Sequence, residues 1–127
     1  GSRVPIRVDL EPPRVWVESG LTYVRRGGAA AVVYSKPEKL AYVTVAMAIT
    51  KDCDCLGREQ AGLLPDIGIL ASRDPVAIDA AVLDLVRERA GQTLESMSYA
   101  SRDASVQIEY AEELGLGERE YELVQVA

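Results

Sequence analysis

The segment from residue 74 to residue 91 limits the fold more than any other part of the sequence. Asp74 followed by Pro75 is typical of a helix start, because aspartate accepts hydrogen bonds from the first free amides and proline fits the first helical position. Gly91 is typical of a helix end. The apolar residues between them recur at the spacing of one buried face, namely Ile78, Val82, Leu85 and Val86, with Asp84, Arg87 and Glu88 facing outward. The sequence therefore predicts an amphipathic helix that has to pack on a second layer.

Two apolar stretches ahead of this helix supply that layer. Residues 40–49 are rich in β-forming side chains and predict a central, largely buried strand, and residues 66–71 predict a shorter strand. The apolar residues are mostly aliphatic, with no Phe and one Trp, which suits helices packed on a sheet. We therefore expect a mixed α/β fold, with a central, mostly buried sheet of about four strands and two to three helices packed on it.

The remaining segments fit into the same domain. Residues 103–114 predict another helix that ends at Gly115, and residues 119–126 alternate as a final strand. Residues 21–34 favour a helix in spite of two central glycines, and the proline-rich residues 1–18 predict an extended lead-in. The expected inward positions of the helix at 103–114 are Val106, Tyr110, Ala111 and Leu114. A length of 127 residues, 48% of them apolar, predicts a single domain spanning residues 1–127.

Charge and composition limit which partners, which location and which chemistry the chain can have. The formal net charge of −6 argues against a nucleic-acid partner or an anionic membrane surface. No apolar stretch reaches the roughly 20 residues of a membrane helix, so no membrane partner is expected. Two cysteines separated by one residue argue against a disulfide scaffold, which favours a cytoplasmic location. The absence of histidine removes Ser-His and Cys-His catalysis and every His-containing metal site from within the chain.

The Cys53-Asp54-Cys55 sequence is the chemically most suggestive feature. In an extended backbone, side chains two residues apart project to the same side, so both sulfurs can reach one point. Two thiolates at that spacing can chelate a soft metal ion or hold one edge of an iron–sulfur cluster, which needs about four ligands in total. The missing ligands would come from another chain, from another segment, or from carboxylates such as Asp52 and Asp66. The alternative is that both residues are ordinary reduced thiols in a loop.

Several carboxylates require a separate interpretation. Asp79 lies at the border of the apolar stripe of its helix, so it either accepts structural hydrogen bonds or belongs to a site. Asp74 is better explained as a helix cap than as a catalytic acid. Asp66 is a candidate loop organiser and a weaker candidate ligand. No glycine spacing matches a phosphate-binding loop. The remaining acidic cluster predicts a solvated face: Glu109, Glu112, Glu113, Glu118 and Glu120.

Three stretches, residues 49–55, 65–79 and 107–117, together resemble the C-terminal part of the family known as domain of unknown function 362. The resemblance extends from about residue 16 to the end of the chain and implies an iron–sulfur-associated or ferredoxin-like redox protein, since many relatives carry a ferredoxin module upstream. Its shared motif positions are Cys53, Cys55, Asp66, Asp74 and Asp79. Relatives often carry a small residue or a further cysteine after Cys55, where this chain has Leu56 and Gly57. The resemblance therefore supplies no third local thiolate.

Three functional hypotheses remain open. The first is a domain of an iron–sulfur-associated redox protein in which Cys53 and Cys55 are partial ligands of a cluster or a soft metal ion, with Asp52, Asp66 and Asp79 as further candidate ligands. The second is an enzyme with Cys53 or Cys55 as nucleophile or Asp79 as an acid or base, a thiol being activated by the N-terminus of the helix that starts at Pro75. The third is a noncatalytic interaction or dimerisation module. The expected partners are a second copy of the chain or an upstream ferredoxin-like domain.

Overall fold

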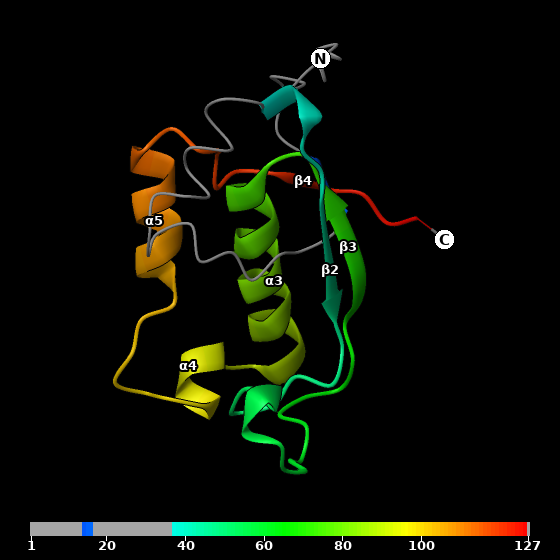
Figure 1. The fold of residues 1–127 in the computed structure, drawn as a ribbon, viewed down its shortest axis with the longest axis vertical. Helices are drawn as coiled ribbons and strands as arrows, with labels where there is room; N and C mark the ends of the chain where they lie inside the picture. Colours follow the sequence, from blue (N-terminus) through cyan, green and yellow to red (C-terminus); the bar gives the residue numbers. More distant parts are fainter. Residues whose placement is uncertain (1–13, 17–36, 127) are drawn as a thin grey trace.

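A layer of helices packed against a small sheet makes up residues 14–16 and 37–126, the part of the chain that the computed structural model describes (Figure 1). The mixed α/β class is confirmed. The helix predicted for residues 21–34 lies outside the described residues, and so does most of the lead-in predicted for residues 1–18. A short 3₁₀ helix, η1 (Pro37–Lys39), leads into the main part of the sheet.

The sheet depends on one antiparallel pair of strands. β2 (Tyr42–Ala46) and β3 (Gly68–Ser72) pair along their full length, with Tyr42 opposite Ser72 and Ala46 opposite Gly68. The strand order is β2-β3-β1-β4, but β1 (Arg14–Trp16) and β4 (Glu122–Leu123) are only three and two residues long. The expected central, mostly buried sheet of about four strands is therefore reduced to one full antiparallel pair with two very short strands beside it, and the strand predicted for residues 119–126 is reduced to two exposed residues.

β2 is not the largely buried strand that its apolar sequence predicts. Thr44 and Ala46 face the helices and are buried, whereas Val43 and Val45 on the opposite face are 67% and 59% exposed. Figure 1 shows α3 on one side of the β2–β3 pair. An apolar run supplies side chains to both faces of a strand, but a helix in the described part of the chain covers only one of them.

The helix predicted after Asp74 is confirmed as α3 (Pro75–Ala90). The Asp74 carboxylate accepts hydrogen bonds from the amides of Val76 and Ala77, both at 2.8 Å, and Gly91 ends the helix with a φ of 70°. The helix packs on the inner face of the sheet through a core that contains Ala46, Leu70, Ala77, Ile78, Ala81, Val82 and Val86. Burial of these apolar side chains holds the two layers together.

Two further helices follow α3. The sequence patterns did not single out α4 (Leu94–Met97), which starts at Thr93. The helix predicted for residues 103–114 is α5 (Ser105–Glu113), but its inward face was assigned wrongly in part. Val106 and Tyr110 are exposed, and the buried residues are Ile108 and Ala111. These two residues form a second core cluster with Val76 and Leu116. The buried face of α5 is therefore the one that contacts Val76 of α3, whatever the number of apolar residues on its other faces.

The same Asp74 carboxylate also anchors the C-terminal segment. Its Oδ2 atom accepts a hydrogen bond of 2.9 Å from the amide of Glu118. Gly117 packs so closely that a Cβ atom there would lie 2.1 Å from Asp74 Oδ1. Burial raises the pKa of Asp74, against the lowering effect of the three amide hydrogen bonds. One buried side chain thus joins the start of α3 to the segment after α5.

Gly117→Ala is expected to lower the free energy of unfolding by about 1–3 kcal/mol, because the added methyl group displaces the Asp74 cap. Denaturant unfolding measures the change. Gly62→Ala is the control, since its Cβ would meet the nearest atoms at an ordinary 3.8 Å. Equal stability of the Gly117→Ala and Gly62→Ala proteins would contradict the close approach of Gly117 to Asp74.

Stability is also expected to fall at alkaline pH. Burial, and then the charge of Asp74, raises the pKa of Tyr42 from 10.0 to about 12. The folded state therefore keeps a proton that the unfolded chain loses, so stability is complete below about pH 10 and declines as the pH rises to about 12. Tyr42→Phe should reduce this decline in denaturation curves recorded from pH 9 to pH 12. Part of the decline should remain, because burial and then Asp84 also raise the pKa of Tyr121. An unchanged decline in Tyr42→Phe would show that deprotonation of Tyr42 does not cause the alkaline loss of stability.

Candidate functional site

The two cysteines lie in the long loop that joins β2 to β3. This loop projects beyond the end of the sheet near α4, on the side away from the start of α3 (Figure 1). Within it, residues Asp54–Leu56 form a 3₁₀ turn, η2, which Gly57 ends with a φ of 62°. The position at the end of a strand agrees with the sequence prediction. The loop leaves both thiols exposed.

A tight turn brings Cys53 and Cys55 together. Cys53 occupies the position before η2, and its Sγ atom accepts a hydrogen bond of 3.3 Å from the amide of Cys55. Hydrogen bonds from the Cys55 thiol and then from its amide lower the pKa of Cys53. The same thiol pairing raises the pKa of Cys55. The sulfurs are neighbours, as the spacing predicts, although the backbone between them is a turn and not an extended strand.

Asp52 anchors the loop through both of its carboxylate oxygens. Oδ1 accepts a hydrogen bond from the Tyr99 hydroxyl, and Oδ2 accepts one from the Arg58 guanidinium. These two groups, Tyr99 first, lower the pKa of Asp52. Gln60 adds two hydrogen bonds to the Asp52 backbone, at 2.9 and 3.0 Å. Asp52 therefore joins the cysteine loop to the segment after α4.

Asp66 organises the other side of the loop. Its Oδ1 atom accepts a hydrogen bond of 2.7 Å from the amide of Ala48. Ala48 has a φ of 50°, in the left-handed region that non-glycine residues seldom adopt. The carbonyl oxygen of Asp66 accepts a hydrogen bond of 3.3 Å from the guanidinium of Arg89, near the end of α3. The interpretation of Asp66 as a loop organiser fits these contacts.

The predicted carboxylate ligands do not gather around the sulfurs. Over residues 14–16 and 37–126, no group of three or more Cys, Asp or Glu side chains is placed to hold a metal ion. Asp79 is buried in the first half of α3, toward the end of the sheet remote from the cysteine loop (Figure 1). Asp74 caps the N-terminus of α3 at that same remote end. This N-terminus is therefore not placed to activate either thiol, which removes the activator that the enzyme hypothesis names.

Three residues that anchor the loop were missed by the sequence analysis, namely Tyr99, Lys51 and Arg58. Tyr99 reaches Asp52 from 47 positions away in the chain, and no local pattern predicts such a contact. Lys51 lies over the Tyr99 ring, 5.2 Å from its centroid, and strengthens the same junction. Arg58 was detectable in principle, because it is the nearest basic residue after four consecutive acidic or thiol side chains in a polar loop, residues 52–55.

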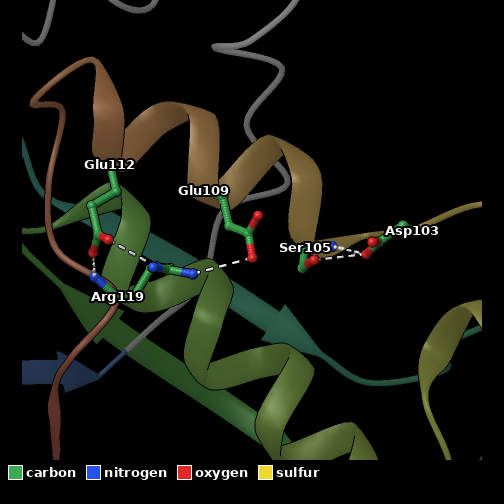
Figure 2. Close-up of polar contacts among 5 residues, drawn as sticks. All are labelled: Asp103, Ser105, Glu109, Glu112 and Arg119. Carbon is green, nitrogen blue, oxygen red and sulfur yellow. Dashed lines mark hydrogen bonds and ion pairs between the residues drawn. The ribbon is translucent and has the colours of Figure 1, made fainter.

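The acidic cluster on α5 has a structural explanation. Figure 2 shows Arg119 between Glu109 and Glu112, with side-chain contacts of 3.2 and 2.8 Å. The amide of Arg119 also donates to Glu112 at 2.5 Å, and this bond is the main cause of the lowered pKa of Glu112. At the start of α5, Asp103 accepts hydrogen bonds from the amide and hydroxyl of Ser105 (Figure 2). The predicted solvated face is thus partly neutralised by one arginine.

Comparison with known proteins identifies one family. The family model described as Domain of unknown function (DUF362) matches residues 18–84, which is more than half of the chain. The matched range includes β2, the cysteine loop, β3 and the first part of α3, and it ends before the resembling stretch at residues 107–117. No curated protein and no solved structure is significantly similar to the chain. Within the described residues, no helix combines the length and apolar character needed to cross a membrane.

Asp52→Ala is expected to loosen the cysteine loop without unfolding the domain, because it removes the bonds from Tyr99 and Arg58. Hydrogen–deuterium exchange should become faster in residues 53–60 and stay unchanged in α3. Asp54→Ala is the matched control, since it removes a neighbouring carboxylate while leaving the Asp52 contacts in place. Wild-type exchange in the loop of Asp52→Ala would show that Asp52 is not its anchor.

Proposed function

The chain belongs to the DUF362 family, and from this premise we propose that it is a domain of an iron–sulfur-associated redox protein in which Cys53 and Cys55 form half of a site for a cluster or a soft metal ion. The family match includes both cysteines. The resemblance of the three sequence stretches adds the expected association with iron and sulfur. The remaining ligands would come from outside the described residues.

The observation that carries the proposal is the pairing of two exposed thiols within one turn. The amide of Cys55 donates to Cys53 Sγ at 3.3 Å, and hydrogen bonds of this kind favour a thiolate. Paired thiolates prefer soft ions such as Zn²⁺ or the irons of a cluster. The donor chemistry therefore fits the group, although this loop supplies two of the about four ligands that such sites use.

The surrounding contacts fit a site that is completed from outside. Asp52 and Asp66 fix the two ends of the loop by hydrogen bonds that do not involve the sulfurs. The thiols therefore remain exposed on an anchored segment and stay accessible to an incoming ion and further ligands. When bound, a cluster would supply one-electron chemistry, and the loop residues would position it and tune its charge.

A noncatalytic interaction module is the second candidate function. Val43, Val45 and Ile69 are large apolar residues with exposed fractions of 59–67%, and Val45 pairs with Ile69 across β2 and β3. Such a surface favours contact with another protein. This candidate needs no metal, so thiol substitution should leave the interaction intact.

Cobalt binding tests the proposed half-site. Under anaerobic conditions, wild-type protein titrated with Co²⁺ should develop the near-ultraviolet absorption of thiolate-bound cobalt. Cys53→Ser and Cys55→Ser should each weaken binding by at least about tenfold, because each removes one ligand. Asp54→Asn is the control, since it keeps both sulfurs and should bind nearly as tightly as the wild type.

The iron–sulfur form is tested in parallel by anaerobic reconstitution with ferrous iron and sulfide, followed by iron analysis and visible absorption. Cluster absorption that disappears in both serine variants is the expected result. Serine variants that bind cobalt and iron as tightly as the wild type, or a wild-type protein that binds neither, would exclude the half-site.

A further inference from the structure

We propose that a second copy of this chain supplies the missing ligands, so that two cysteine loops meet at a two-fold axis and hold one metal ion between four thiolates. This inference rests on the half-site proposed above and goes beyond it by naming the partner. The observation that points to it is an exposed pair of thiols in the loop that connects β2 to β3, two strands that carry an exposed apolar strip.

The ligand inventory limits where further soft ligands can come from. The 127-residue sequence contains two cysteines and no histidine, so no third thiolate or imidazole exists elsewhere in it. The described residues bring no carboxylate pair to the sulfurs. Tetrahedral sites for soft ions commonly use four ligands of sulfur or nitrogen. A second copy related by a two-fold axis contributes an identical pair of thiolates, so the two copies together supply four ligands without another kind of partner.

The loop is shaped for such a meeting. Every residue from 53 to 59 is exposed, and the loop projects from the end of the domain (Figure 1). The Asp52 anchor uses contacts with Tyr99 and Gln60, whereas the contact from the Cys55 amide to Cys53 Sγ stays within the turn itself. Two loops can therefore approach each other without either domain losing its own anchor.

The neighbouring surface supports the same partner. Val43, Val45 and Met47 are exposed along β2 and its continuation, which leads directly into the cysteine loop, and Ile69 extends the strip onto β3. Two-fold symmetry brings the same patch of both copies together, so this apolar strip would be buried beside the metal. The segment from residue 51 to residue 59 carries both signs of charge, with Lys51 and Arg58 against Asp52, Asp54 and Glu59, which gives a formal net charge of −1. The divalent ion therefore has to offset a residual repulsion between the two loops.

Coordination requires deprotonation and no redox partner. Each of the four thiols loses its proton to solvent as its sulfur binds the divalent ion, which leaves a complex with a net charge of −2. Zinc is a suitable probe because it binds four thiolates without changing its oxidation state.

The experiment is a titration of the full 127-residue chain with zinc acetate under anaerobic conditions, with molar mass from light scattering and bound zinc measured on the same samples. The expected result is a zinc-dependent doubling of mass with one zinc per two chains. Cys53→Ser and Cys55→Ser should remain monomeric. Val45→Asp, a change at a surface position, should keep the thiols but weaken zinc-dependent dimerisation by at least about tenfold.

The outcomes separate this inference from the half-site itself. One zinc bound per monomer would overturn the symmetric dimer and leave the half-site standing. No zinc bound at any concentration would overturn both. A dimer that forms equally without zinc, or in both serine variants, would show that the thiols do not bridge the two copies.

Discussion

The carboxylate and the backbone amide of Asp74 together join three parts of the chain at one buried point. Oδ1 caps α3, Oδ2 holds the amide of Glu118, and the amide of Asp74 donates to the Ser72 hydroxyl at the end of β3, at 3.0 Å. These contacts fix the direction in which the chain turns from β3 into α3. They therefore also fix which end of the sheet is left for the cysteine loop, because the loop enters β3 at its opposite end.

α3 could be predicted because the residues that start and end it act on the neighbouring backbone. The burial of β2 and the inward face of α5 were predicted wrongly because they depend on contacts with distant parts of the chain. A cap, a proline and a closing glycine act within a few residues of the backbone they organise. The burial of Val43 and Val45 depends instead on how many layers cover the sheet, and the sequence of β2 does not contain that information. The face of α5 is likewise set by its contact with Val76, from another helix, and an apolar count alone pointed to Val106.

The candidate site was likewise predictable only where it depends on neighbouring residues. Residue type and spacing were enough to single out Cys53 and Cys55, because thiols two positions apart have few geometric options. The anchor could not be predicted, since Tyr99 and Asp52 are brought together only after α3 and α4 have been packed. Asp79 shows the converse: it shares a motif with Asp66 in sequence but lies in the first half of α3, remote from the cysteine loop, because β3 carries the chain to the opposite end of the sheet before α3 begins.

The matched family segment ends at residue 84, in the middle of α3, and so does not coincide with the folded unit. Val76 lies within that segment, but the residues that bury it, Ile108, Ala111 and Leu116, lie beyond it. In this chain, the matched segment therefore has an apolar side that the residues after it cover. That covering piece supplies two things: an apolar seam for Val76 and a backbone donor for Asp74.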